Sequence, residues 1–187
     1  MSQYNDNWLI NIRQELYSLG LNYIWNLSYV DDSTYIIIKE RMLDTFKQLC
    51  YSKTMSTPKG LLYQHLLYEF RLQKYLRLPM ETRYIKEICK IRICAHKLNV
   101  ESGRYRNIER SERICTLCNV NVIEDEYHFI IECPQYKDLR CKYIKMYYYK
   151  RPSVYRFIQL LTTGNNKELK NLGKYLLQAN AIRDRSM

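Results

Sequence analysis

Cys115-Thr116-Leu117-Cys118 is followed by His128 and then by Cys133-Pro134, so that three thiols and one imidazole recur at the spacing C-x2-C-x9-H-x4-C. A Cys-x2-Cys turn can present two sulfur atoms to one tetrahedral ion, and a later histidine and cysteine can complete the coordination. We therefore predict a site for one zinc ion, with the ligands Cys115, Cys118, His128 and Cys133. The alternative is a set of buried cysteines that lie close together by chance.

Four protein ligands would fill the tetrahedral coordination of zinc and leave no open position for water or substrate. The predicted role of the ion is therefore structural. In zinc-finger peptides, metal binding contributes on the order of 10 kcal/mol to folding. We expect the region around residues 113–140 to depend on the ion for its fold.

The composition is that of a folded protein. The chain has 187 residues, 47% of them hydrophobic, with only 5 Gly and 4 Pro, which is enough for one sizeable core. It contains no long uncharged apolar run and no cleavable signal, so we expect an intracellular protein, nuclear or cytoplasmic, that is not secreted and contacts no membrane. In a reducing compartment its 7 Cys would be thiols or metal ligands rather than disulfides.

Charge is distributed unevenly along the chain. Formal net charges are −1 over residues 1–70, +7 over 71–113, −4 over 114–134 and +9 over 135–187, for a total of +11. Two basic segments therefore flank an acidic metal-binding segment, and nucleic acid is the natural partner for such a distribution. The acidic segment itself is expected to be a poor contact for phosphate. The alternative is a set of solvated helix faces.

Hydrophobic periodicity predicts an all-α fold of about seven helices. Gly20 is expected to end the first helix, and Asp31 and Asp32 to cap the second. The predicted helices span residues 8–19, 35–51, 61–76, 81–98, 134–149, 153–161 and 167–181. The second helix is expected to bury a stripe formed by Ile38, Met42, Leu43, Phe46 and Leu49.

The zinc segment is predicted to be a small insertion between the fourth and fifth helices, with a short β-hairpin possible at the Cys-x2-Cys turn. Glu124-Asp125-Glu126 has the character of an acidic first turn of a short helix that carries His128. Cys133 would cap the next helix, because proline is favoured at the first helical position.

The expected organisation has two regions that pack as one compact unit. An N-terminal helical region spans residues 1–78, and a second helical region spans 79–187 and carries the zinc module at about 113–140. The polar stretch 52–60 is a candidate hinge between helices.

Several stretches together resemble the zinc-binding region at the C-terminal end of reverse transcriptases from LINE-type (non-LTR) retrotransposons. The likeness covers about residues 83–160, and more loosely the N-terminal helices. It is carried by residues 90–105, by Arg113-Ile114-Cys115-Thr116-Leu117-Cys118, by Ile123-Glu124-Asp125-Glu126-Tyr127-His128-Phe129, by Glu132-Cys133-Pro134-Gln135-Tyr136, and by the tail 147–158. The resemblance implies that the same three cysteines and His128 are ligands. It also implies an accessory region of a retroelement polyprotein that helps to hold template or target nucleic acid.

Tyr29-Val30-Asp31-Asp32 matches the Tyr-x-Asp-Asp signature of a polymerase palm, in which paired carboxylates hold two divalent ions. We interpret it as a chance match, because that chemistry needs another aspartate on an earlier strand, and the preceding residues are expected to be mostly helical. The sequence also lacks a Gly-rich phosphate loop, a Gly-x-Ser-x-Gly elbow and a His-Glu-x-x-His motif. No catalytic residue is predicted, and the chain is not expected to be an enzyme.

Other potential ligands are Cys94, His96 and Cys141. Residues two apart do not share a face of a helix, which argues against a site made by Cys94 and His96. Core packing is the preferred interpretation for the remaining cysteines, which are Cys50, Cys89, Cys94 and Cys141. His65 and His96 are expected to be structural or exposed.

Basic residues on both sides of the metal segment are the predicted contacts to RNA or DNA. They are Arg104, Arg106, Arg110, Arg113, Lys137, Arg140, Lys145, Lys150 and Arg151. Nearby tyrosines, including Tyr147-Tyr148-Tyr149, could stack on bases, although at least half of the 19 Tyr are expected in the core. Two alternatives remain open. One is a zinc-stapled helical interaction domain whose partner is a protein, with a polymerase as one candidate, and the other is a degenerate retroelement fragment without a cellular role.

Overall fold

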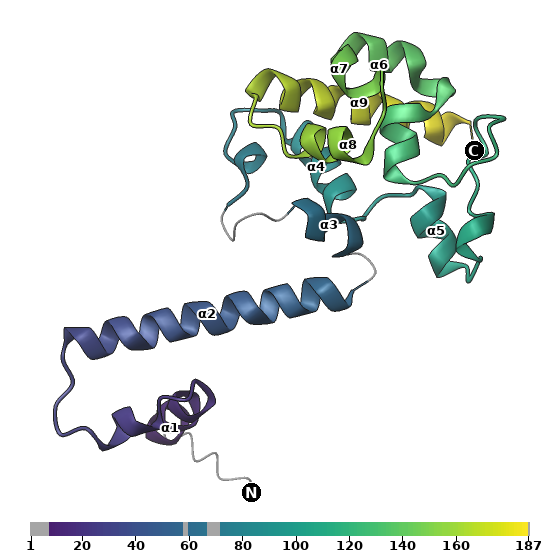
Figure 1. The fold of residues 1–187 in the computed structure, drawn as a ribbon. Helices are drawn as coiled ribbons and strands as arrows, with labels where there is room; N and C mark the ends of the chain where they lie inside the picture. Colours follow the sequence, from purple (N-terminus) through teal and green to yellow (C-terminus); the bar gives the residue numbers. More distant parts are fainter. Residues whose placement is uncertain (1–7, 58–59, 67–71, 187) are drawn as a thin grey trace, which may run out of the picture. The chain divides into compact units, whose positions relative to one another are not determined.

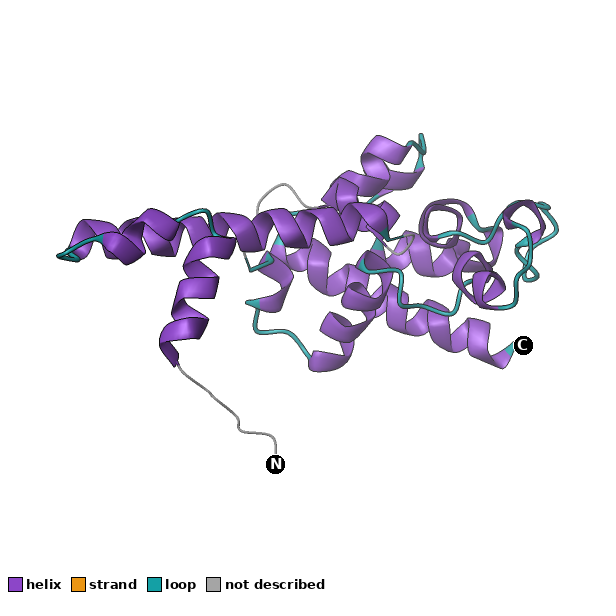
Figure 2. Ribbon diagram, turned by 90° about the horizontal axis from the view of Figure 1, so that it is seen from below, coloured by secondary structure: helices purple, strands orange, loops and turns teal. Residues whose placement is uncertain are grey.

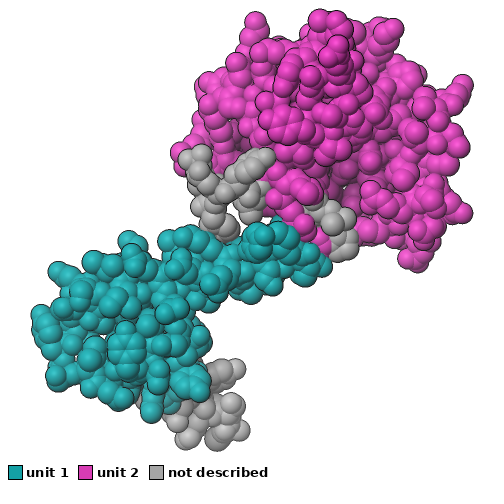
Figure 3. All heavy atoms as spheres, in the orientation of Figure 1, with its two compact units in different colours: residues 1–56 teal, residues 57–187 magenta. Residues whose placement is uncertain are grey.

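The structure is a computed structural model that describes residues 8–57, 60–66 and 72–186. It divides into two compact units, residues 1–56 and 57–187 (Figure 3). The boundary predicted from the sequence lies between residues 78 and 79. Leu66 and Tyr75 lie between the observed and the predicted boundary, and both are buried in the core of the second unit.

The first unit contains α1 (Trp8–Ser18), the 3-10 turn η1 (Asn22–Asn26) and α2 (Asp32–Ser56). Gly20 ends α1 as predicted, with a left-handed φ of 69°. Its amide donates to the Tyr17 carbonyl at 3.0 Å, and the Leu21 amide donates to the Leu16 carbonyl at 2.8 Å. This pair of hydrogen bonds is the Schellman motif, which glycine favours because it has no Cβ.

Asp31 caps α2, as predicted. Its Oδ1 accepts hydrogen bonds from the Ser33 hydroxyl at 2.7 Å and from the Thr34 amide at 2.9 Å. The Ser33 hydrogen bond, followed by those of Thr34, lowers the pKa of Asp31 to about 2. The negative charge of this carboxylate therefore stabilises the N-terminus of α2.

The prediction that α2 buries a stripe of apolar residues is wrong for the four members of that stripe that follow Ile38. Met42 and Leu49 are 55% and 50% exposed, and Leu43 and Phe46 are similarly exposed. The core of this unit is small and consists of Leu16, Leu21 and Ile24, with Leu19 and Ile38 packed against it. A 25-residue helix extends well beyond so small a core, at about 1.5 Å per residue.

The second unit is a cluster of short helices around one long C-terminal helix (Figures 1 and 2). The residues that the structure describes are mostly helical and contain no β-sheet, in agreement with the predicted fold class. In order, the elements are α3 (Gly60–Leu66), η2 (Lys74–Leu76), α4 (Thr82–Arg92), α5 (Asn99–Tyr105), η3 (Arg110–Glu112), η4 (His128–Glu132), η5 (Pro134–Tyr136), α6 (Lys137–Tyr143), α7 (Met146–Tyr149), α8 (Val154–Leu161) and α9 (Asn166–Arg185).

Three predicted helices are shorter or broken. Part of the predicted helix 61–76 lies outside the described residues, and its described parts form α3 and η2. The predicted helix 81–98 ends at Arg92, because Cys94 takes a left-handed φ of 50° and the Ala95 amide turns back to the Lys90 carbonyl at 2.7 Å. The predicted helix 134–149 is interrupted at Ile144, whose backbone is extended.

α9 is the central element of the second unit, and α4 and α6 pack against it. Its inner face buries Leu172, Tyr175, Leu176 and Ala179 completely. At Gly173 the two backbones of α4 and α9 approach closely, since a Cβ there would lie 2.5 Å from the Cβ of Tyr84. No helix among the described residues is long and apolar enough to cross a membrane.

A buried ion pair connects α9 to the segment that carries the predicted ligands. Arg183 and Glu124 are only 2% and 1% exposed. The guanidinium donates from Nε to Oε1 at 2.7 Å and from NH2 to Oε2 at 2.8 Å. The Asn99 amide at the start of α5 also donates to Glu124 Oε2, at 2.7 Å. One carboxylate therefore joins three segments that lie far apart in the sequence.

Replacement of Arg183 by methionine should destabilise the second unit, because Glu124 would remain buried without its cation. Loss of one partner of a buried pair costs about 3–5 kcal/mol. The free energy of unfolding can be measured by urea denaturation followed by circular dichroism. Arg185→Met, at an exposed position of the same helix, is the matched control. Equal unfolding free energies for the two variants would contradict this role for Arg183.

Candidate metal centre

The first two candidate ligands lie on a minimal hairpin. Ile114 and Ile123 form an isolated antiparallel bridge. The Cys115 amide donates to the Val122 carbonyl at 2.8 Å, and the Glu124 amide donates to the Arg113 carbonyl at 2.9 Å. The turn between these strand-like segments carries Cys118. The sequence interpretation of a short hairpin at the Cys-x2-Cys turn therefore agrees with the hydrogen bonding.

The other two candidate ligands are His128, the first residue of a π-helical turn His128–Glu132, and Cys133, which follows the turn. In an α-helix, residues five apart differ by about 140° around the axis, so His128 and Cys133 would face different directions. A π turn has an i→i+5 hydrogen bond, which here runs from the Cys133 amide to the His128 carbonyl at 2.7 Å. The wider turn places both side chains on the same side.

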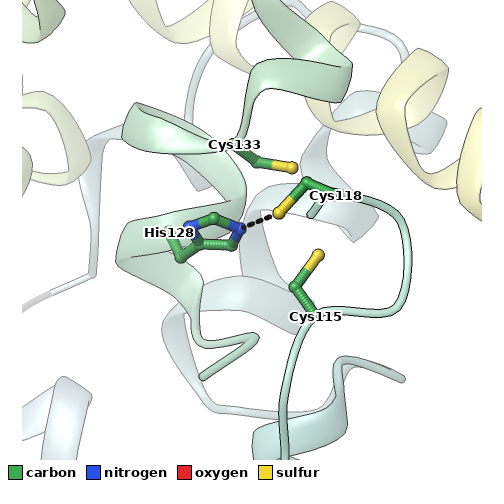
Figure 4. A group of neighbouring side chains, drawn as sticks. All are labelled: Cys115, Cys118, His128 and Cys133. Atoms are coloured by element: carbon green, nitrogen blue, oxygen red, sulfur yellow. Dashed lines mark hydrogen bonds between the residues drawn. The ribbon is translucent and has the colours of Figure 1, made fainter. Parts of the chain in front are cut away.

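The four side chains converge on one space (Figure 4). The three Sγ atoms and one imidazole nitrogen all lie within 4.8 Å of one another. The Sγ of Cys118 lies 3.4 Å from Nε2 of His128. Cys115, His128 and Cys133 are buried, and Cys118 is half-buried. The group can therefore hold a metal ion such as zinc with little exposure to solvent.

Burial sets the protonation preferences of the four candidate ligands. Burial raises the pKa of Cys115, and it raises the pKa of Cys133 to about 12, so both thiols favour the protonated form. Burial also lowers the pKa of His128, which keeps the imidazole neutral. A dication would favour the thiolates that the buried site otherwise disfavours, while neutral imidazole is already the ligand form.

One imidazole atom fits a metal site only in part. Nδ1 of His128 is buried and has no hydrogen-bond partner among the described residues. Metal-bound histidines usually donate this second N–H to an acceptor. The backbone of His128 is supported by Asp125, whose Oδ1 accepts the His128 amide at 2.8 Å.

The acidic residues of the triplet 124–126 have partners inside the protein. Glu124 binds Arg183, and Asp125 caps the turn that carries His128. Oε1 of Glu126 lies 2.8 Å from Nε2 of His96. The sequence did not identify these partners, because each is distant along the chain or belongs to the backbone.

Cys94, His96 and Glu126 form a second group of potential ligands within 4.8 Å. The argument from helix geometry against this pair is wrong, because α4 ends at Arg92 and neither residue lies in a helix. A different observation argues against a metal here. The Leu98 amide donates to Nδ1 of His96 at 3.3 Å, so the ring proton belongs on Nε2, where it meets Glu126. This arrangement is a hydrogen-bond network, and Nε2 has no lone pair free for an ion.

The remaining cysteines differ in exposure. Cys94 is buried as predicted, Cys89 packs against the core, and Cys50 is half-buried. Cys141 is exposed, contrary to the predicted core position. His96 is structural, as expected, with a side chain only 3% exposed. His65 is exposed.

Two of the nine basic residues predicted to bind nucleic acid instead donate hydrogen bonds to backbone carbonyls within the protein. Arg140 is 5% exposed and donates to the carbonyls of Ile130 at 2.8 Å and Cys133 at 2.7 Å. Arg113 donates to the carbonyls of Ile108 at 2.9 Å and Val100 at 2.8 Å. Both guanidiniums hold the backbone around the candidate metal centre and are not free for phosphate.

Two others are neutralised by neighbouring carboxylates. Arg104 pairs with Glu101 at 2.8 Å, and Lys145 pairs with Glu168. The five that remain are exposed and form no salt bridge among the described residues. They are Arg106, Arg110, Lys137, Lys150 and Arg151.

Fewer tyrosines lie in the core than the expected half, because only five of the described ones are buried, Tyr75, Tyr84, Tyr136, Tyr148 and Tyr175. Tyr136 and Tyr148 are buried, whereas Tyr147 is 49% exposed and lies under the guanidinium of Arg156, 4.6 Å from the ring centroid. An exposed ring that already stacks on a cation is compatible with base stacking.

Comparison with known proteins finds no matching family model, curated protein or solved structure. The resemblance to the LINE-type zinc-binding region therefore rests on the motif and its spacing. The geometry of the candidate metal centre is independent of that resemblance, because it is an arrangement of side chains in this chain.

Cys115→Ser should abolish metal binding, whereas Cys94→Ser should retain one zinc ion per chain. The first variant removes one of four converging ligands, and the second removes only a member of the hydrogen-bond network. Zinc content of the purified proteins can be measured by inductively coupled plasma mass spectrometry. Two zinc ions in the parent, or loss of zinc in Cys94→Ser, would show that the second group also binds metal.

Proposed function

We propose that this chain is a non-catalytic, zinc-binding accessory domain of a retroelement reverse-transcriptase-like protein, which binds RNA or DNA through the phosphate backbone. The observation that carries the proposal is the convergence of Cys115, Cys118, His128 and Cys133 within 4.8 Å. Their spacing is also the one that resembles the LINE-type region. The ion to which this group is suited is zinc, because three sulfurs and one nitrogen in a compact set match its tetrahedral coordination.

A structural role for the ion follows from the number of ligands. All four positions of a tetrahedral site would be occupied by side chains, so none would remain for a reacting water or substrate. The candidate ligands also lie at the ends of very short elements, a two-residue bridge and a five-residue π turn. Such elements have little stability of their own, and cross-linking through an ion would hold them together.

The nucleic-acid part of the proposal is supported by unpaired positive charge. Arg106 and Arg110 lie near α5, while Lys137, Lys150 and Arg151 lie near α6 and α7, and Figure 1 shows α5 and α7 far apart within the second unit. Exposed lysines and arginines without carboxylate partners attract phosphate and release condensed counterions on binding. Three of the nearby acidic residues, Glu124, Asp125 and Glu126, are engaged inside the protein.

A second candidate function is a zinc-stapled protein interaction domain, with a polymerase as one candidate partner. It is favoured by the apolar surface of α2, where Tyr35 is 64% exposed and Ile36 is 52% exposed. Exposed apolar residues of this size along one helix are typical of surfaces that bind other proteins. The two functions are compatible, because they use different parts of the chain.

Removal of the metal with a chelator should loosen residues 113–140 and leave residues 8–56 unchanged. The expected signal is faster amide hydrogen exchange in the first range, measured by mass spectrometry, because local stability there depends on the ion. His128→Ala should reproduce the effect without a chelator. His65→Ala is the control, since His65 is exposed and is not one of the candidate ligands. Unchanged exchange over 113–140 in both treatments would refute a structural role.

Binding to nucleic acid should weaken steeply with salt. For three or more phosphate contacts, the dissociation constant should rise by at least about tenfold between 50 and 200 mM KCl. It can be measured by fluorescence anisotropy with labelled RNA and DNA. Lys137→Gln combined with Arg151→Gln should weaken binding, and Lys39→Gln combined with Arg41→Gln, on the first unit, is the charge-matched control. No binding at 50 mM KCl would favour the protein interaction domain.

A further inference from the structure

Three lysines that the predicted set omits lie along the exposed side of α9. Lys167, Lys170 and Lys174 are separated by three and four residues, so they share one face of the helix together with Gln178. The opposite face is the one that enters the core through Leu169, Leu172 and Leu176. The lysine stripe is therefore held in a fixed orientation by the best-packed helix of the second unit.

Lys167, Lys170 and Lys174 form no salt bridge with a carboxylate among the described residues. The nearest acidic residue on the helix, Glu168, lies to the side of the stripe. It accepts hydrogen bonds from Tyr148 at 2.8 Å and Thr163 at 2.6 Å, and it pairs with Lys145. By contrast, Lys90, Lys97, Arg104 and Arg183 each form a salt bridge. The positive charge of the stripe is thus left uncompensated.

α6 brings a further lysine and an aromatic ring to the same face. The two helices pack together, and Gln178 Nε2 donates to the hydroxyl of Tyr143 at 2.8 Å. The ammonium of Lys142 lies 5.2 Å from the centroid of the Tyr143 ring. The Gln178 hydrogen bond, with Lys142 and Lys174 nearby, lowers the pKa of Tyr143. Lys142 and Lys174 therefore both lie near the same tyrosine.

We propose that this α6–α9 face, formed by Lys142, Tyr143, Lys167, Lys170 and Lys174, is the main contact of the protein with the phosphate backbone of a nucleic acid. The inference rests on the proposed function and specifies its surface. A stripe of cations along one helix is the electrostatic footprint of such proteins. Lysines act as point charges without the fork geometry that reads bases, so the contact is expected to be independent of sequence.

The α6–α9 face is better suited to this contact than the basic residues near α5. There, Arg113 braces the backbone and Arg104 is paired with Glu101, which leaves Arg106 and Arg110. On the α6–α9 face, four lysines are free of salt bridges among the described residues. The stripe from Lys167 to Lys174 extends for about 10 Å along the axis at 1.5 Å per residue, enough to follow several phosphates of one strand.

The test compares two variants that lose the same number of charges. In the first, Lys142, Lys170 and Lys174 are all replaced by Gln, and in the second, Lys39, Arg41 and Lys86 are replaced by Gln. Five of the six positions are exposed, and Lys174 is half-buried. Fluorescence anisotropy with 20-nucleotide single-stranded RNA, single-stranded DNA and duplex DNA is recorded between 50 and 200 mM KCl. Zinc content and thermal unfolding of both variants are checked against the parent.

The first variant should bind at least about tenfold more weakly at 50 mM KCl, and its salt slope should fall by about 2 on single strands, near 0.7 for each lost contact. The control variant should bind like the parent. An equal loss on RNA and DNA supports a contact with phosphate, and a loss on one polymer alone assigns the surface to that polymer.

Two results would overturn the inference, and they are distinguishable. If the parent binds and both variants bind equally well, nucleic acid uses another surface, and the proposed function stands without this one. If the parent binds no nucleic acid at 50 mM KCl, the inference and the proposed function fail together. If the parent binds anionic vesicles of phosphatidylcholine and phosphatidylserine but no nucleic acid, the inference and the proposed function also fail together.

Discussion

The carboxylate of Glu124 is the point on which the second unit depends. It receives two hydrogen bonds from Arg183 and one from the Asn99 amide, all between 2.7 and 2.8 Å. A buried charge of this kind is tolerated only when it is paired and hydrogen-bonded. The requirement links the hairpin of Cys115, the start of α5 and the end of α9, so that the candidate metal centre is fixed to the longest helix of its unit.

The same principle explains where the charge of the protein is found. Glu124, Asp125 and Glu126 interact with partners inside the protein, whereas most of the lysines of the C-terminal segment are exposed to solvent. The formal net charge of +11 is therefore carried mainly by the surface. Arg113 and Arg140 are exceptions, because guanidiniums with several donors can satisfy buried carbonyl groups that a lysine would satisfy less completely.

Much of the local structure could be predicted from the sequence, and the errors have identifiable causes. Gly20 and Asp31 were recognised as helix-ending and helix-capping residues because their chemistry is local. The end of α4 was missed because Cys94 occupies a left-handed position for which glycine is the usual signal. The exposed stripe of α2 was missed because periodicity identifies an apolar face without identifying what covers it.

The sequence by itself determined the identity and order of the four candidate ligands, the helical class of the fold and the uneven charge, because these depend on residue type and short spacing. Only the tertiary structure decided that Arg183 meets Glu124, that Glu126 meets His96, and which basic residues are free. These outcomes depend on partners that are distant along the chain, and burial of charged groups selects among such partners only once the chain has folded.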